Sequence, residues 1–196
     1  MGRAATLGVL VEERADSNTA LVEACLRGDQ DAWAALVDKY KRLIFSIPIR
    51  QGFSREDAAD VFQTVCVDLV RDLPRLREPE ALPQWLIRTT LHTCGRHRLR
   101  QQRAAAANAA ASELATAVED VPDALVRQLE RDQALRDAIR TLPPRCRLMV
   151  EMLFFETPPV PYAEVAVRLG LATGSVGFIR GRCLERLRAA LRRAGL

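Results

Sequence analysis

The apolar residues of this chain recur at intervals of three and four positions in most segments, which is the period of an amphipathic helix. Between residues 33 and 47 the inward positions of such a helix are Trp33, Leu36, Val37, Tyr40, Ile44 and Ile47. No segment shows the strict alternation of apolar and polar residues that is typical of a strand. The pattern therefore predicts an all-α protein.

Helix start and stop signals divide the pattern into separate elements. Thr19 can cap a first short helix, and an aspartate at position 29 or 31 starts the second, which Pro48 and Gly52 are expected to end. Ser54 and Asp57 resemble a capping box ahead of the third helix. The predicted helices cover approximately residues 20–27, 29–47, 54–73, 84–100, 125–141, 145–155, 162–169 and 175–191.

An alanine-rich stretch separates the helices into two groups. Residues 104–111 are alanine with one asparagine, and without large apolar side chains they cannot build a core. We therefore expect two small helical domains joined by a flexible linker. The predicted organisation is a flexible tail over residues 1–17, a first domain over 18–101, the linker over 102–124 and a second domain over 125–196.

The second domain contains a segment with the pattern of a helix-turn-helix. Gly170 stands between two short helical patterns, where a tight turn favours glycine. Outward side chains of the second helix would contact DNA, as in a recognition helix. The candidates for this contact are Ser175, Gly177, Phe178, Arg180, Arg182 and Arg186. The alternative interpretation is an ordinary helical hairpin with a basic surface.

The net charge of +4 is unevenly distributed along the chain. Residues 88–103 contain five arginines and no acid, and residues 168–196 contain seven arginines and one glutamate. Residues 54–80 instead contain seven acids and four arginines. Two basic segments and one acidic segment indicate two kinds of partner, although solvated helix faces would give a similar pattern.

Several other functions are not indicated by the sequence. The five cysteines form no CxxC pair, so we expect reduced thiols that pack as small apolar side chains in a cytoplasmic protein. His92, Cys94 and His97 cannot readily converge on a metal ion, because positions five apart on a helix point in different directions. No nucleophile–base set, phosphate-binding glycine loop or membrane-spanning segment is found. We expect no enzymatic activity, no cofactor and no metal.

Six segments together resemble one known family. They are Leu21–Trp33, Asp57–Val65 (DAADVFQTV), Trp85–Thr90 (WLIRTT), Leu142–Val150 (LPPRCRLMV), Tyr162–Ala166 (YAEVA) and Arg182–Arg188 (RCLERLR). In this order and spacing they resemble extracytoplasmic-function (group 4) RNA polymerase sigma factors of the sigma-70 superfamily. The resemblance covers about residues 20–100 and 125–193.

The resemblance implies a set of roles for individual residues. Asp57, Asp60 and Gln63 match the positions that bind the clamp of core RNA polymerase. The helix-turn-helix would read the minus-35 element as duplex. The minus-10 single strand would be held by the loop of residues 77–83 and the helix after it. The minus-10 candidates are Arg77, Trp85, Arg88, His92, Arg96, Arg98 and Arg100.

The sequence departs from the family pattern at three positions. The family usually has asparagine at the position of His92 and aspartate at that of Arg96, and Thr64 replaces an acid. Trp85 begins the apolar face of its helix, so a core position is the alternative to stacking on a base.

The function implied is that of an initiation factor that binds core RNA polymerase and promoter DNA, with an anti-sigma factor as a possible further partner. A transcriptional regulator that binds DNA without polymerase is the main alternative. A sigma-like protein that binds polymerase or an antagonist without initiating transcription is another.

Overall fold

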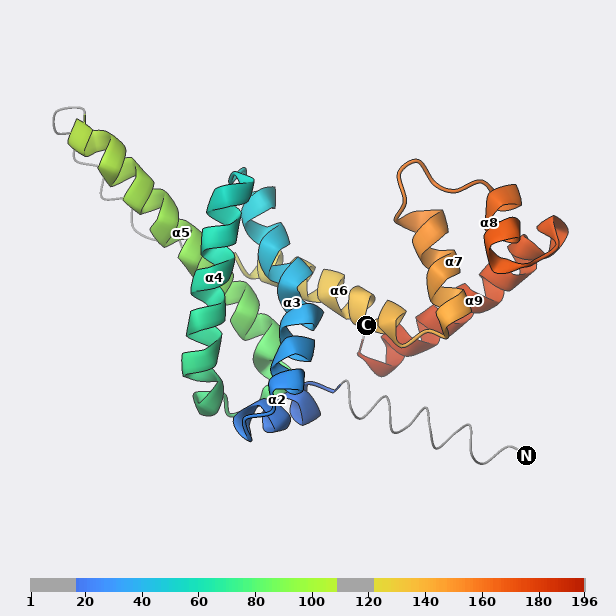
Figure 1. Ribbon diagram of the computed structural model, residues 1–196, viewed down its shortest axis with the longest axis horizontal. Helices are drawn as coiled ribbons and strands as arrows, with labels where there is room; N and C mark the ends of the chain where they lie inside the picture. The colour runs from blue at the N-terminus through green and yellow to red at the C-terminus, as the bar shows by residue number, and fades with distance from the viewer. Residues whose placement is uncertain (1–16, 109–121, 196) are drawn as a thin grey trace. The chain divides into compact units, whose positions relative to one another are not determined.

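The computed structural model describes residues 17–108 and 122–195, and within them every regular element is helical (Figure 1). The all-α prediction is confirmed. The elements are α2 (Asn18–Leu26), α3 (Gln30–Arg50), α4 (Arg55–Asp72), η1 (Leu73–Arg75), η2 (Pro79–Ala81), α5 (Leu82–Asn108), α6 (Asp123–Arg140), α7 (Pro144–Phe154), α8 (Tyr162–Leu169), η3 (Thr173–Ser175) and α9 (Val176–Arg193). The predicted tail, apart from residue 17, and residues 109–121 of the predicted linker lie outside the described residues.

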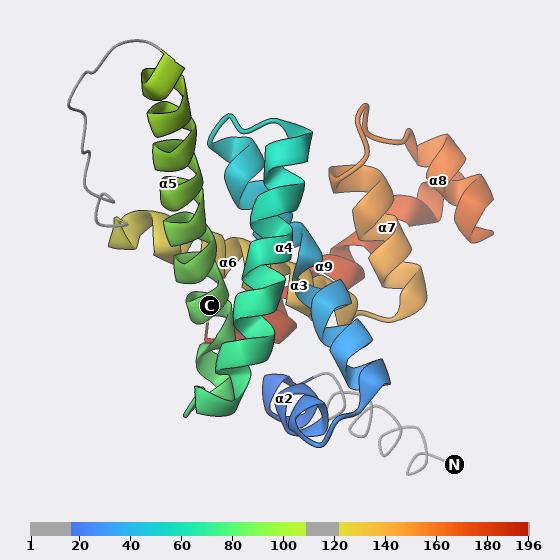
Figure 2. The ribbon, with the colours of Figure 1, turned by 60° about the vertical axis from the view of Figure 1, so that its left-hand side comes forward.

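The chain divides into two compact units, residues 1–130 and 131–196. In the first unit, α3, α4 and α5 pack against one another and α2 packs on α3 (Figure 2). In the second unit, α7 packs on α8 and α9. The boundary between the units lies inside α6, so residues 123–130 belong to the first unit.

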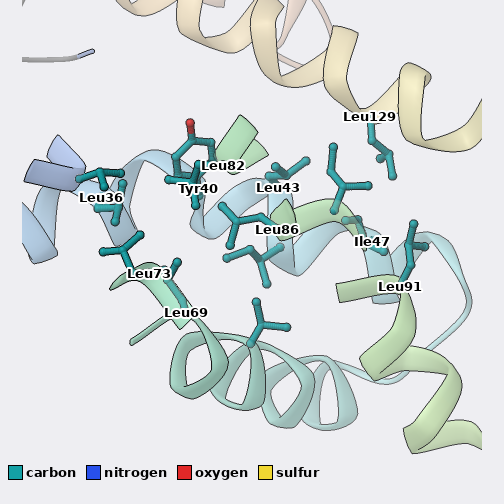
Figure 3. Close-up of a cluster of buried hydrophobic side chains, with 14 of the residues drawn as sticks. Leu36, Tyr40, Leu43, Ile47, Leu69, Leu73, Leu82, Leu86, Leu91 and Leu129 are labelled. Carbon is teal, nitrogen blue, oxygen red and sulfur yellow. The ribbon is translucent and has the colours of Figure 1, made fainter. Parts of the chain in front are cut away.

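The core of the first unit is built from large aliphatic side chains of three helices. Leu36, Leu43 and Leu86 are fully buried, and Tyr40 is 1% exposed. Figure 3 shows these side chains converging between α3, α4 and α5. Leu129 of α6 joins the same cluster and is 2% exposed. The first turns of α6 therefore complete this core.

Two helix starts illustrate how short polar side chains set the bounds. Ser17, and not Thr19, caps α2: its Oγ accepts a hydrogen bond from the amide of Ala20 at 3.1 Å. Thr19 lies inside the helix and donates its hydroxyl to Glu80 at 3.0 Å. The capping role predicted for Ser54 is confirmed, because its Oγ accepts from the amide of Asp57 at 3.0 Å.

The second helix ends between Pro48 and Gly52, the two residues that were predicted to end it. Pro48 lies in the last turn of α3, where the amide that it lacks removes only one hydrogen bond. The helix ends at Arg50, and Gly52, which follows the cap residue Gln51, has a φ of +83° in the left-handed region. The amide of Phe53 donates to the carbonyl of Pro48 at 3.1 Å, and that of Gly52 to Ile49 at 3.0 Å. This Schellman motif satisfies the last carbonyl groups of α3.

The fourth helix is longer than the sequence pattern predicted. α5 ends at Asn108, whereas the apolar pattern ends near Arg100. The additional turns are rich in alanine, the residue with the highest helix propensity. These turns extend beyond α3 and α4 (Figures 1 and 2). The first residues of the predicted linker, 102–108, are therefore helical.

The core of the second unit lies between α7, α8 and α9. Met149, Val165 and Val176 are fully buried there. Cys146 of α7 and Cys183 of α9 are joined by a disulfide in this core, so the expectation that all five cysteines are reduced is wrong for this pair. Their side chains lie on facing positions of two packed helices, which the sequence pattern alone did not reveal. The turn predicted at Gly170 is left-handed, with φ +60°.

Candidate functional site

The acidic candidates on α4 differ in how far they are exposed. Asp60 and Gln63 are exposed and lie one turn apart. Asp57 is half-buried, and its carboxylate accepts hydrogen bonds from the hydroxyl of Ser54 at 2.7 Å and from Gln101 Nε2 at 2.9 Å. His97 Nε2 lies 3.6 Å from the same carboxylate. Asp57 therefore stabilises the start of α4 and its contact with α5, while Asp60 and Gln63 face outward.

Four of the basic-helix candidates form a row along α5. Arg88, His92, Arg96 and Arg100 follow one another at intervals of four, and all four are exposed. Arg98 lies on a different side of the helix: its guanidinium donates to the carbonyl of Gln51 at 3.1 Å. The structure brings most of the predicted minus-10 residues to one side of α5, but not Arg98.

Two arginines of this row are paired with acids of the first unit. Arg88 Nη2 lies 3.1 Å from the carboxylate of Asp123 at the start of α6. Arg96 Nη2 lies 3.5 Å from Asp68 of α4 and also donates to the hydroxyl of Thr93 at 3.0 Å. Because both arginines remain largely exposed, these ion pairs are easily exchanged for phosphate contacts.

A pocket of about 280 Å³ lies between α4 and the second half of α5. The lining side chains are all polar: Asp60, Gln63, Thr64, Thr93, Arg96, His97 and Arg100. Nδ1 of His97 is buried without a hydrogen-bond partner within the described part of the chain. Residues predicted to bind polymerase and residues predicted to bind DNA line the same pocket. Asp60 and Gln63 belong to the first group, and Arg96 and Arg100 belong to the second.

The remaining minus-10 candidates lie at the start of α5 and before it. Arg77 is exposed in the segment between η1 and η2. Trp85 is partly buried and packs against the core of the first unit. The geometry of Trp85 therefore favours the core interpretation over a free stacking surface.

Aromatic rings position two arginines of the second unit. Arg180 Nη1 donates to the hydroxyl of Tyr162 at 2.6 Å, and its guanidinium carbon lies 5.9 Å from the centre of that ring. The guanidinium carbon of Arg182 lies 5.9 Å from the ring of Phe178, which is 71% exposed. Each arginine is thus held over an aromatic face, an arrangement that restricts its rotamers.

The other candidates of the second unit have varied surroundings. Ser175 is half-buried in η3, and Gly177 is exposed with open space around the position of a side chain. Arg186 Nη1 lies 3.8 Å from the sulfur of Cys146. Tyr162 is a functional residue that the sequence did not reveal. The turn at Gly170 was predicted, but the contact between Tyr162 and Arg180 depends on how α8 and α9 pack, which no local pattern specifies.

Part of the first unit matches a known protein family. Residues 36–104, which contain most of α3, all of α4, η1 and η2, and most of α5, match the family model of Sigma-70 region 2. No curated protein matches the chain. The region 2 match supports a sigma factor of the sigma-70 superfamily, a class of non-catalytic proteins that bind core RNA polymerase and promoter DNA in transcription initiation.

Across residues 17–108 and 122–195, no three or more histidine, cysteine or acidic side chains are grouped closely enough to hold a metal ion. In the same ranges no helix combines the length and apolar character needed to cross a membrane.

Proposed function

We propose that the protein is an extracytoplasmic-function sigma factor that docks on the clamp of core RNA polymerase through α4. The observation that carries this proposal is the region 2 match over residues 36–104 together with the outward position of Asp60 and Gln63. An exposed acid and an exposed amide one helical turn apart suit a basic partner surface. Asp57 supports that surface by anchoring the start of α4.

The minus-10 contact is assigned to the exposed row on α5. Arg88, His92, Arg96 and Arg100 would follow the phosphates of a melted strand, since all four lie on one side of one helix. The Asp68 and Asp123 carboxylates would release Arg96 and Arg88 when phosphates take their place. Binding energy for the single strand would then favour opening of the duplex, and no covalent bond is made or broken.

The minus-35 contact is assigned to the second unit, with α8 and α9 as the helix-turn-helix. Arg180 and Arg182, held over Tyr162 and Phe178, would present their guanidinium groups to base edges in the major groove. Arg186 and the arginines near the end of α9 would contact phosphates. The protein acts in the cytoplasm in this proposal, and an anti-sigma factor is a further possible partner.

Affinity for purified core RNA polymerase, measured at two salt concentrations, tests the proposal. The Asp60→Arg variant should bind at least about tenfold more weakly, because a like charge then faces the basic partner. Glu23→Arg, which makes the same change of charge at an exposed position of α2, should bind like the wild type. Both variants should unfold at the wild-type temperature.

A folded wild-type protein that fails to bind polymerase would contradict the sigma-factor proposal. Retained affinity for duplex DNA in that case would identify a free-standing DNA-binding regulator. Equal losses in Asp60→Arg and Glu23→Arg would show that overall charge, and not the surface on α4, determines the affinity.

A further inference from the structure

The disulfide of the second unit joins the helix that carries the predicted DNA contacts to the helix on which it packs. Cys146 lies in the first turn of α7 and Cys183 in the middle of α9, with their Cα atoms 5.3 Å apart. The cross-link encloses α8, the turn at Gly170 and the first two turns of α9. All base-contact candidates, residues 175–182, are therefore inside the closed loop.

The two sulfurs differ in how readily they could react. Cys146 lies next to the N-terminus of α7, and the guanidinium of Arg186 is 3.8 Å from its sulfur. A helix N-terminus and a cation both stabilise a negatively charged sulfur, which is the reactive form of cysteine. Both cysteines are buried, since Cys146 is 6% and Cys183 is 1% exposed, but Cys183 lies in the middle of α9, away from either helix end. Cys146 is thus the sulfur that would attack first, and helix ends open more easily than helix centres.

The other three cysteines have the opposite environment. Burial raises the pKa of the thiols of Cys25 and Cys66, and it raises the pKa of Cys94 to about 11. These thiols remain protonated near neutral pH and react slowly. The chain therefore contains one cysteine pair arranged for thiol–disulfide chemistry and three cysteines that are expected to stay reduced.

We infer that Cys146 and Cys183 form a reversible redox pair that sets the stability of the second unit and, through it, the affinity of α9 for duplex DNA. The part of this inference that concerns DNA rests on the proposed function. The existence of the pair and its effect on stability do not.

The oxidation would proceed by exchange with a low-molecular-weight disulfide. The thiolate of Cys146 attacks one sulfur of that disulfide, forms a mixed disulfide and releases one thiolate. Cys183 then loses its proton, attacks the Cys146 sulfur and releases the second thiolate. The two released thiolates take up the two protons, so the protein is oxidised and the small disulfide is reduced to two thiols.

The oxidised and reduced forms should differ in the second unit. In the oxidised form α9 cannot separate from α7, which restricts the unfolded chain over 37 residues. In the reduced form apolar contacts alone hold α9, and the Cys146 thiolate competes with DNA phosphates for the guanidinium of Arg186. The oxidised form should therefore be the more stable one and should bind DNA more tightly.

The first experiment is a redox titration of the full chain. The protein is equilibrated in glutathione buffers of graded ratio, quenched with acid and labelled with a maleimide that adds mass to each free thiol. Two thiols should be lost together in one step. A variant with Cys25, Cys66 and Cys94 all changed to Ala should show the same step, whereas Cys146→Ala and Cys183→Ala should not.

The second experiment measures thermal unfolding of the wild type in both redox states, which requires no substitution. Both tryptophans of the chain, Trp33 and Trp85, lie in the first unit, so their fluorescence reports on that unit alone. Circular dichroism follows the helices of both units. The unfolding transition of the second unit is the one seen by circular dichroism but not by tryptophan fluorescence. Oxidation should raise its midpoint by more than about 10 °C.

The third experiment compares the affinity of the two forms for a mixed-sequence DNA duplex at low salt. The oxidised form should bind about fivefold more tightly, because α9 is held in its binding arrangement. Five free thiols at every buffer ratio, equal midpoints in the two forms, or equal DNA affinities would each overturn the inference. If neither form binds DNA or polymerase, the proposed function fails, while the thiol titration still decides whether the pair exists.

Discussion

At the scale of the residue, the contact between Arg180 and Tyr162 is the most specific feature of the second unit. The hydroxyl of Tyr162 accepts a hydrogen bond of 2.6 Å, and the guanidinium also lies over the ring. A long side chain that is already oriented loses less conformational entropy when it binds. In the proposed function, Tyr162 would therefore position Arg180, and Arg180 would contact the base.

Substitution of these two residues should separate contact from positioning. Arg180→Ala should weaken binding to a duplex selected by the wild type about 5- to 150-fold, which corresponds to the loss of about 1–3 kcal/mol for one base contact. Tyr162→Phe keeps the ring and should weaken binding to the same duplex only a few-fold. Fluorescence anisotropy at fixed salt measures both, and affinity for core polymerase should stay unchanged.

An unchanged affinity of Arg180→Ala for the selected duplex would show that the register assigned to α9 is wrong. A loss in Tyr162→Phe as large as that in Arg180→Ala would instead identify the tyrosine hydroxyl as a direct contact.

The buried thiol of Cys94 predicts how stability depends on pH. Burial raises its pKa to about 11 from the ordinary value of 9.0, so between these values the native state holds a proton that the unfolded state has lost. The free energy of unfolding should therefore fall as the pH rises from about 9 toward 11. Urea unfolding at pH 8 and pH 10, followed by tryptophan fluorescence, measures this fall. The fall should be smaller in Cys94→Ala, and an equal fall in both proteins would assign it to other groups.

At the scale of the element, the first turns of α6 belong to the core of the first unit. Val126 and Leu129 are 1% and 2% exposed, and Asp123 pairs with Arg88. The sequence pattern placed most of these turns in the second domain, because the helical period restarts there. Periodicity identifies the apolar face of a helix, but it does not identify which core that face enters.

Truncation of Leu129 tests this assignment. Leu129→Ala should destabilise the first unit by about 2–5 kcal/mol, the usual cost of a cavity at a buried leucine. Denaturant unfolding followed by the fluorescence of Trp33 and Trp85 reports that unit. Leu148→Ala on α7 is the matched control, since Leu148 is 49% exposed and should change the stability by less than about 0.5 kcal/mol. A tryptophan transition unaffected by Leu129→Ala would place α6 outside the first core.

The helix bounds show where local signals were sufficient. Ser54 and Gly170 act locally, and the structure places their helix ends where the sequence predicted them. Pro48 does not itself end α3, because a proline in the last turn costs little when a Schellman motif at Gly52 follows. The additional turns of α5 form because alanine has a high helix propensity. Alanine does not produce the periodic pattern of large apolar residues from which the helices were predicted.

At the scale of the whole molecule, the fold class could be predicted from the sequence. The contacts between side chains that lie far apart in the sequence could not. The helical period alone predicts an all-α protein. The pairing of Cys146 with Cys183, and of Arg180 with Tyr162, depends on how helices pack over long separations in the sequence. The polar pocket between α4 and α5 belongs to the same category, because its walls come from segments that were assigned to different partners.

That pocket has a thermodynamic consequence for the proposed complex. Asp60 and Gln63, assigned to polymerase, face the same space as Arg96 and Arg100, assigned to DNA. A charged partner bound to one pair of side chains changes the electrostatic field at the other pair, so the proposed function predicts that the two binding free energies are coupled. By linkage, the factor by which polymerase alters the affinity for the single strand equals the factor by which the strand alters the affinity for polymerase. The affinity of the first unit for promoter DNA would then depend partly on whether polymerase is already bound.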